Sequence, residues 1–222
     1  RISFDQANFP FMYGKNGKAM GVYPALVEAA FKRMQVTARF QVRPCARVLL
    51  EIEDGIAGVG GLYKSAERER KYDFSEPLLT EVIMVYYNKA KPVACSRGDL
   101  KGLRVGVVRG WSYGNEFDAA RRAGNFTVEE TVADKHNFQK LALGRLDVVV
   151  APIETGKLEL PQFSNLAMCS VPLAQNPTFL AFAKTAGKTV LLRHFNKTIK
   201  EMKTSGEFDG IVAAEMTAAG VH

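Results

Sequence analysis

Arg68 is the residue whose type and position most clearly suggest chemistry. It follows the glycine-rich apolar run 57–63 (AGVGGLY) and precedes the turn sequence 74–77 (FSEP). The apolar run is typical of a buried strand, and its glycines, including Gly61, would let a ligand approach the backbone closely. A guanidinium on the turn after such a strand can hold a carboxylate through two parallel hydrogen bonds. The alternative is a solvated helix surface, because the charges alternate in sign over residues 67–71.

Alternating strand and helix patterns surround this arginine. The apolar residues of segment 24–33 recur at helical spacing, and Pro24 stands near the first helical position, where proline is tolerated. Segment 37–42 alternates as a half-buried strand does. This alternation predicts parallel α/β units. We expect further strands at 2–4, 57–63, 82–87, 103–108, 127–132, 148–151 and 176–183, and helices at 47–53, 113–123, 135–143, 189–204 and 207–216.

Length and composition are ordinary for a globular chain. The 222 residues are 47% hydrophobic and 24% charged. A chain of this length buries enough surface to fold without disulfide bonds or bound metals. No apolar run approaches the roughly 20 residues needed to span a bilayer. Because the chain begins at Arg1 rather than at a methionine, we expect a processed product whose export signal has been removed.

Charge and residue spacing argue against several functions. The formal net charge is +7, but lysine and arginine are spread along the chain without a dense block, so no nucleic-acid partner is expected. Attraction to an anionic membrane or an acidic ligand explains the charge equally well. The three histidines lack a paired spacing, and no phosphate-loop or dinucleotide fingerprint is present, so we expect no metal and no cofactor.

The motifs around Arg68 resemble those of a known family. Residues 65–68 (SAER), then 73–77 (DFSEP) and a second strand, resemble the periplasmic solute-binding proteins of amino-acid-type ABC transporters, the bacterial extracellular solute-binding proteins of family 3. The resemblance covers nearly the whole chain. Further motifs in the matching order lie at 9–11 (FPF), 16–21 (NGKAMG), 99–107 (DLKGLRVGV), 141–150 (LALGRLDVVV) and 205–211 (SGEFDGI).

This resemblance implies a fold and a function. The implied fold is α/β, a two-lobed periplasmic-binding-protein fold of type II with two crossing hinge strands. Lobe one would comprise residues 1–88 and 183–222, and lobe two residues 89–182; such hinges allow closure around a ligand. The implied protein is a periplasmic monomer without enzymatic activity. It would bind a small organic anion, amino acid or amino-acid-like solute between its lobes and deliver it to the membrane permease of an ABC transporter.

In lobe one, the resemblance assigns the ligand carboxylate to Arg68. Tyr63 stands where the family usually has a hydroxyl residue that also contacts the carboxylate, and its main-chain N–H can still donate. Asp5, Phe11 and Tyr13 follow the first strand, where the family places residues that select the ligand side chain. Asp5 would pair with a cationic group or cap a turn.

Two more arginines extend the expected site. Arg47 heads a helix that faces the cleft in the family layout, and an arginine is unfavourable at a helix start, which favours a functional purpose. In lobe two, Arg109, Trp111 and Ser112 occupy a strand-to-helix turn, where free N–H groups face the cleft in the family. We expect Ser112 to donate to the carboxylate and Trp111 to line the cleft, with a core position as the alternative for the tryptophan.

Pro152 is the main departure from the family pattern. Amino-acid binders of this family have an aspartate near this position that pairs with the ligand's α-ammonium group, and proline cannot do so. Either Glu154 reaches in from two residues later, or the ligand lacks an α-amino group.

Two other functions stay open at this point. Some relatives of the family are sensor domains of membrane receptors, and others are cyclohexadienyl-dehydratase-like enzymes that need a catalytic acid in the cleft. Glu154 or Asp5 would supply that acid. A hydrolase is not indicated, because no Gly-x-Ser-x-Gly motif is present.

The three cysteines allow one disulfide and one thiol, or three separate thiols. The family layout places Cys95 on the connector into lobe two and Cys169 on the segment that leaves it, so the resemblance implies that these two pair. Cys45 would remain in lobe one, before the helix of Arg47.

Overall fold

The computed structural model describes residues 1–95 and 99–221. The chain forms two compact units, which we call unit 1 and unit 2. Unit 1 combines Arg1–Leu79 with the segment that starts at Pro177, and unit 2 is the continuous segment Thr80–Asn176. The chain therefore passes between the units twice. Among the described residues, no helix is both long and apolar enough to cross a membrane.

The sheet of unit 1 has the strand order β13-β6-β1-β5, with β7 also beside β13. Strand β1 (Ile2–Asp5) pairs in parallel with β5 (Phe40–Arg43) and β6 (Gly58–Tyr63). Strand β13 (Ala174–Ala183) runs antiparallel to β6 and to β7 (Tyr72–Phe74). The carboxyl ends of the parallel strands β1, β5 and β6 therefore share one edge of the sheet.

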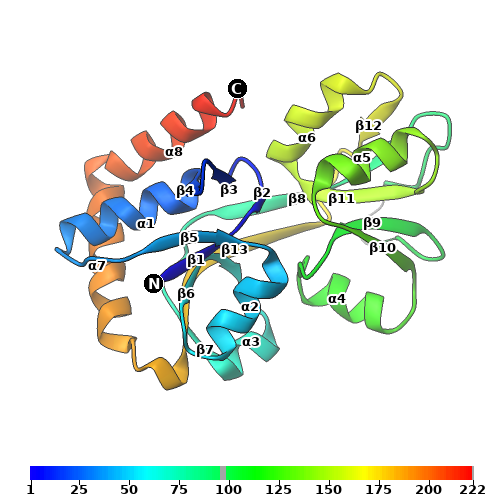
Figure 1. Cartoon of the computed structure of the whole chain (residues 1–222). Helices are drawn as coiled ribbons and strands as arrows, with labels where there is room; N and C mark the ends of the chain where they lie inside the picture. Colours follow the sequence, from blue (N-terminus) through cyan, green and yellow to red (C-terminus); the bar gives the residue numbers. More distant parts are fainter. Residues whose placement is uncertain (96–98, 222) are drawn as a thin grey trace. The chain divides into compact units, whose positions relative to one another are not determined.

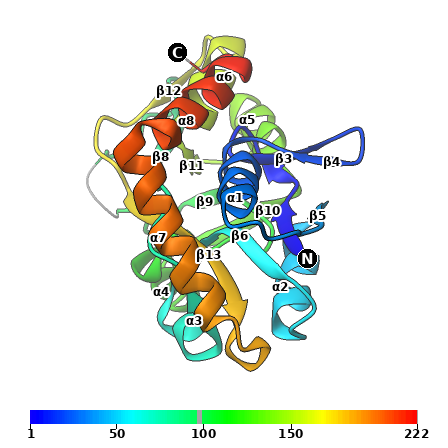
Figure 2. The ribbon, with the colours of Figure 1, turned by 90° about the vertical axis from the view of Figure 1, so that its left-hand side faces the viewer.

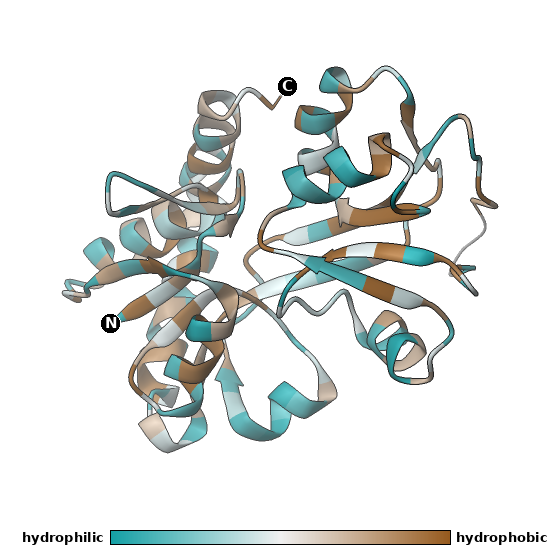
Figure 3. Cartoon of the chain, turned by 45° about the vertical axis from the view of Figure 1, so that its right-hand side comes forward, coloured by the Kyte–Doolittle hydropathy of each residue, from teal (hydrophilic) through white to brown (hydrophobic). Residues whose placement is uncertain are grey.

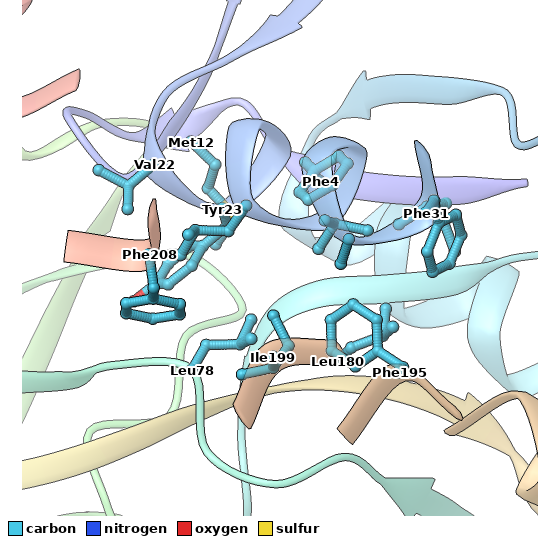
Figure 4. Packing of buried hydrophobic residues seen from close by; sticks show 14 of the residues in the cluster. Phe4, Met12, Val22, Tyr23, Phe31, Leu78, Leu180, Phe195, Ile199 and Phe208 are labelled. Carbon is cyan, nitrogen blue, oxygen red and sulfur yellow. The ribbon is translucent and has the colours of Figure 1, made fainter. Parts of the chain in front are cut away.

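One face of this sheet carries the main core of unit 1. Helices α1 (Val22–Arg33), α7 (Thr189–Ser205) and α8 (Glu207–Ala218) pack against one another there, as Figures 1 and 2 show. Figure 4 shows how their apolar side chains meet those of β1 and β13. The labelled members of this cluster are Phe4, Met12, Val22, Tyr23, Phe31, Leu78, Leu180, Phe195, Ile199 and Phe208.

The other face of the sheet is covered by α2 (Cys45–Glu53). Strand β6 leads into α3 (Ala66–Lys71), and a short 3-10 turn, Lys184–Ala186, follows β13. A separate small antiparallel sheet comprises β2 (Ala7–Asn8), β3 (Met12–Lys15) and β4 (Lys18–Met20), where the sequence predicted only a loop.

The strands of unit 2 have the order β10-β9-β11-β8, with β12 also beside β8. Strand β9 (Arg104–Val108) is parallel to β10 (Thr127–Thr131) and β11 (Val148–Pro152). Strand β8 (Thr80–Asn88) is antiparallel to β11 and to β12 (Leu166–Met168).

Helices lie on both faces of the unit 2 sheet. Helix α4 (Asn115–Arg122) is on one face, and α5 (Asp134–Ala142) and α6 (Ile153–Glu159) are on the other (Figures 1 and 3). A 3-10 turn, Leu160–Gln162, extends α6. The core under α5 includes Tyr86 and Phe138, whose ring centroids are 4.9 Å apart.

Every helix and strand expected from the sequence is present, with ends displaced by at most three residues. The α/β class and the two-lobed fold are confirmed. The units divide after Leu79 and after Asn176, whereas the expected lobe boundaries lay at 88/89 and 182/183. The difference arises because β8 pairs with β11 along Ile83–Tyr87 and so belongs to unit 2.

Cys95 and Cys169 form a disulfide inside unit 2, with their Cα atoms 5.3 Å apart. This is the pairing that the family resemblance implies. Cys45, which begins α2 in unit 1, is a thiol.

Candidate functional site

Arg68 is anchored at the carboxyl end of β6 in unit 1. Its Nη1 donates a hydrogen bond of 2.8 Å to the carbonyl oxygen of Tyr63, the last residue of the strand. Its main-chain N–H donates to Oγ of Ser65, the N-cap residue of α3, at 3.2 Å. This main-chain N–H is therefore already used by the cap. The guanidinium, held against the strand end, remains the group that can bind an anion.

Cys45 lies close enough to both Asp5 and Arg68 for their charges to act on its thiol. Burial and the negative charge of Asp5 together raise the pKa of the Cys45 thiol to about 12, against the positive charge of Arg68, which lowers it. The thiol also hydrogen-bonds to the Asp5 carboxylate. Three elements thus contribute to one group of side chains: the end of β1, the start of α2 and the first turn of α3. We call Asp5, Cys45 and Arg68 the unit 1 cluster.

Asp5 has two roles in the cluster. It is only 4% exposed, and its Oδ1 accepts a hydrogen bond of 3.0 Å from the N–H of Ala7, which caps the turn after β1. The sequence left turn capping and charge pairing as alternatives; the structure shows the cap, and Asp5 also acts on the thiol of Cys45. Sequence reasoning missed Cys45 as a member of this group, although its position at the start of the Arg47 helix was a usable signal.

Arg47 is directed toward Glu51, one turn later on α2. The Arg47 Nε and a carboxylate oxygen of Glu51 are 3.5 Å apart, while 60% of the arginine side chain is exposed. Glu51 itself is buried and accepts hydrogen bonds from Ser3 Oγ at 2.5 Å and from Gln41 Nε2 at 2.9 Å. The charge of Arg47 is therefore partly offset by a neighbour within unit 1.

Phe11 and Gly61 both pack against Tyr23 within unit 1, and their expected ligand contacts stay predictions. Phe11 is 2% exposed, and its ring stacks on Tyr23 with the centroids 5.5 Å apart. Gly61 has φ of +77°, and a Cβ atom there would lie 2.5 Å from Cδ2 of Tyr23. The space beside this glycine is thus filled by the protein's own ring. The glycine lets β6 pack against Tyr23, and ligand approach from that side is blocked.

Two tyrosines of unit 1 differ in accessibility. Tyr63 is 8% exposed and presents its carbonyl oxygen to Arg68. Tyr13 is half-buried on β3, with its ring 4.8 Å from that of Phe9, and burial raises its pKa. Tyr13 is therefore the more accessible of the two.

In unit 2, Ser112 is bonded to a neighbouring carboxylate. Its hydroxyl donates to Oδ2 of Asp118, and the N–H of Tyr113 donates to Oδ1 of the same residue at 3.3 Å. Asp118 thus occupies two donors of the turn between β9 and α4. For Ser112 to donate to a ligand carboxylate, its bond to Asp118 would have to break.

Arg109 and Trp111, the other two residues expected at this turn, both contact neighbours within unit 2. Arg109 directly follows β9, and its Nε lies 3.5 Å from a carboxylate oxygen of Glu130, with 64% of the arginine side chain exposed. Trp111 is only 9% exposed, and its ring centroid is 6.0 Å from that of Tyr113. The tryptophan is thus mainly packed against its neighbour, and its expected role in ligand binding stays a prediction.

Glu154 lies close to the end of β11, two residues after Pro152. Its Oε2 is buried and has no hydrogen-bond partner among the described residues, and burial raises the pKa of this carboxyl group. Tyr86 donates its hydroxyl hydrogen to the carbonyl oxygen of Pro152 at 3.0 Å. Burial raises the pKa of Tyr86, and the nearby charges of Asp134 and Glu154 raise it further. This end of β11 is therefore an acidic, buried environment that would favour a cation.

Within the described residues, no group of three or more histidine, cysteine, aspartate or glutamate side chains is arranged to hold a metal ion. The groups that remain for chemistry are the unit 1 cluster, in which Asp5 is buried while Arg68 and Cys45 are partly exposed, and an acidic strand end in unit 2. Each of these two groups by itself suits recognition of a charged molecule by hydrogen bonds and ion pairs.

The fold is that of the two-lobed periplasmic binding proteins. The chain belongs to the bacterial extracellular solute-binding proteins of family 3, whose family model matches residues 1–215. It is 26% identical over 208 residues to the L-cystine-binding protein TcyJ of Escherichia coli (strain K12), an alignment that covers 91% of this chain and 76% of TcyJ.

Two solved structures are similar over almost their whole length. A histidine kinase sensor domain with similarity to periplasmic binding proteins matches with a TM-score of 0.84 and 22% identity, covering 96% of this chain and 93% of that one. An ancestral arginine-binding protein bound to arginine matches with a TM-score of 0.81 and 26% identity, covering 96% of both chains. Ligand binding is thus the activity shared with the matched family and with the named binding proteins.

Proposed function

We propose that this protein is the exported, periplasmic binding component of an ABC transporter. It captures a small solute with a carboxylate group, an amino acid or an amino-acid-like molecule, and delivers it as a monomer to the membrane permease. The observation that carries the proposal is the unit 1 cluster, in which Arg68 is fixed at a strand end and shares the neighbour Cys45 with the buried Asp5. The family membership and the amino-acid ligands named for its relatives support the same solute class.

The proposed chemistry is non-covalent. Arg68 binds the carboxylate through charge-assisted hydrogen bonds, and Asp5 balances the guanidinium and attracts any cationic group of the solute. Arg47, Tyr13 and Tyr63 are the further candidate ligand contacts in unit 1, and Arg109, Ser112 and Glu154 are the candidates in unit 2. A solute that contacts both units favours a closed arrangement of the protein, since it binds that arrangement more tightly.

A thermal-shift screen of carboxylates, amino acids and polyamines identifies the solute, because a ligand that binds only the native state raises the melting temperature. Titration of the best hit then tests Arg68. We expect Arg68→Ala to weaken binding by about 2–5 kcal/mol, the usual cost of truncating one partner of a buried charged pair. Arg70→Ala is the matched control on the exposed side of α3. Equal affinity of wild type and Arg68→Ala would refute the carboxylate assignment.

Substitution of Glu154 in unit 2 tests whether the solute carries an ammonium group. If Glu154 pairs with such a group, Glu154→Gln weakens α-amino acids much more than the matching carboxylic acids that lack the amino group. If the solute has no α-amino group, the carboxylic acids bind best and Glu154→Gln leaves them unchanged. Tight binding of α-amino acids that is insensitive to Glu154→Gln would contradict both forms of the proposal.

The gene beyond His222 tests the proposed partner. A stop codon there agrees with a transporter component, whereas a membrane-spanning segment would indicate the sensor domain of a receptor. Turnover assays with cyclohexadienyl substrates test the enzymatic alternative, and measurable dehydration would refute a purely binding function.

A further inference from the structure

Unit 2 contains a cavity that none of the solute-binding residues named above lines. Its volume is about 620 Å³, and its walls come from residues 113–114, from α4, from Leu100 and Phe126 in the segments that precede β9 and β10, and from the segment 173–176. Cavities of roughly 300–1,000 Å³ are the usual size of small-molecule sites. All lining residues belong to unit 2, so this unit alone forms the cavity.

One wall of the cavity is aromatic. Tyr113, Phe117 and Phe126 form a continuous row, with ring centroids 5.1 Å apart for the first pair and 4.9 Å apart for the second. Each ring is at most 6% exposed. Leu100, which is 4% exposed, adds an aliphatic surface. A wall of this kind suits a flat apolar body, because aromatic rings stack in offset or edge-to-face arrangements.

The polar feature of the cavity is the side-chain amide of Asn176. This residue is 9% exposed, and its Nδ2 has no hydrogen-bond partner in the part of the chain that the structure describes. A buried donor without a partner costs roughly 1–3 kcal/mol. An oxygen acceptor on a bound molecule would remove this cost, so the amide favours a ligand with such an atom.

The start of α4 reinforces this preference for an acceptor. Its N-cap residue, Gly114, lines the cavity and provides no side-chain cap, and a helix N-terminus carries a partial positive charge. Gly114 has φ of +107°, and a Cβ atom there would lie 3.1 Å from Oδ1 of Asn176. A glycine at this position therefore allows the amide of Asn176 to lie beside the helix start.

Glu116 determines the charge of the occupant. Its exposed side chain also lines the cavity, in the first turn of α4, and a carboxylate there repels a second anion. Since a free carboxylate is disfavoured and an oxygen acceptor is favoured, the chemistry selects an uncharged molecule with a carbonyl-type oxygen.

We propose that this cavity is a second ligand site, which binds a small uncharged aromatic molecule through stacking on Phe117 and a hydrogen bond from Asn176 Nδ2 to a carbonyl oxygen. The site lies within one unit and does not use Arg68. It can therefore be occupied with or without the transported solute, and its existence does not depend on the proposed transport function.

Acetophenone is a suitable probe, because it has one aromatic ring and one carbonyl oxygen. Titration of the isotopically labelled full chain, followed by NMR, should give saturable shifts of the Asn176 side-chain amide. Asn176→Leu removes the donor at similar size and should weaken binding about tenfold, equivalent to ~1.4 kcal/mol. Ala120→Phe fills the cavity and should abolish binding, whereas Ala119→Phe, on the exposed side of the same helix, should not change it.

Arg68→Ala should leave acetophenone binding unchanged, which separates this site from the proposed solute site. The absence of saturable shifts up to the solubility limit of the probe would overturn the proposal. Equal affinities for wild type and a folded Ala120→Phe variant would overturn it as well. Ala120→Phe keeps the test decisive even if Asn176→Leu fails to fold.

Discussion

The thiol of Cys45 reports on the charges around Arg68. Because burial and Asp5 raise its pKa to about 12, only about one thiol in 10⁴ is ionised at pH 8, and alkylation by iodoacetamide should be slow. Asp5→Asn removes a negative charge, so we expect a lower pKa and faster alkylation. Arg68→Ala removes a positive charge and should have the opposite effect. Asp54→Asn, on the exposed end of α2, is the control. Rates that do not respond to Asp5→Asn would show that the two side chains are not neighbours.

Ser112 and Asp118 should stabilise unit 2 as a pair. A hydroxyl that donates to a partly buried carboxylate forms a charge-assisted hydrogen bond, which typically contributes about 1.5–3 kcal/mol to stability. We therefore expect Ser112→Ala and Asp118→Ala to be non-additive, with a coupling free energy of about 1 kcal/mol or more in a double-mutant cycle. Urea unfolding of the four proteins measures it. Additive losses would mean that the hydroxyl is available to a ligand.

Sequence spacing predicted where site residues lie along the chain better than what their side chains contact. Arg68 was expected after a strand and is found there, because the motif determines the turn that follows β6. The same spacing could not reveal that Phe11 and Gly61 both pack against Tyr23, because each of them is well separated from Tyr23 along the sequence. Such packing depends on three-dimensional neighbours, and local sequence does not encode it.

At the scale of elements, Asp147 ties β11 to β9. Its carboxylate accepts hydrogen bonds from the main-chain N–H of Arg104 at 2.8 Å and from the side chains of Arg104 and Lys91. Burial alone would raise the pKa of Asp147, but these bonds lower it well below its ordinary value.

A group whose pKa is lower in the folded state stabilises the protein above its unfolded pKa, about 3.9 for aspartate, and this stability is lost as the pH falls below that value. We expect Asp147→Asn to lower the free energy of unfolding at pH 7. The variant should also lose less of this free energy as the pH falls. Urea unfolding between pH 7 and pH 3 measures this, with Asp209→Asn on the exposed surface of α8 as the control. An equally steep acid dependence in Asp147→Asn would contradict the assignment.

Substitution of two helical glycines by alanine should change the stability of the protein in opposite directions. At Gly156 in α6, an added Cβ would lie 2.1 Å from Oη of Tyr86, whereas nothing lies within 4 Å of such an atom at Gly210 in α8. Alanine has the higher helix propensity, so Gly210→Ala should raise stability by about 0.5–1 kcal/mol. Gly156→Ala should lower it by about 1–3 kcal/mol, because the overpacking exceeds the gain in propensity. Thermal unfolding compares the two, and stabilisation by Gly156→Ala would show that Tyr86 moves freely.

The elements that sequence predicted and those that it missed differ in length and pattern. Helices such as α1 and α7 repeat their apolar residues over several turns and were predicted close to their true ends. The strands β2 to β4 have two to four residues, too few for alternation to register. Helix α6 was missed because it starts directly after Pro152 and contains Gly156, which a helix interior disfavours.

At the scale of the whole molecule, the two units differ in how the chain builds them. Unit 2 is one continuous segment, whereas unit 1 is completed only when the chain returns at Pro177. The disulfide between Cys95 and Cys169 spans 74 residues of sequence and lies entirely within unit 2. The disulfide therefore stabilises unit 2 directly. Unit 1 has no disulfide among its described residues.

This asymmetry can be measured because Trp111, the one tryptophan of the sequence, belongs to unit 2. Tryptophan fluorescence therefore follows the unfolding of unit 2, while far-UV circular dichroism follows both units. Closing a loop of about 75 residues stabilises by roughly 4–5 kcal/mol in the chain-entropy model. We expect reduction, or Cys95→Ser with Cys169→Ser, to lower the urea midpoint seen by fluorescence and to split the dichroism transition into two. Cys45→Ser, which removes no disulfide, is the control. If both signals instead shift together as one transition after reduction, the two units unfold as a single cooperative body.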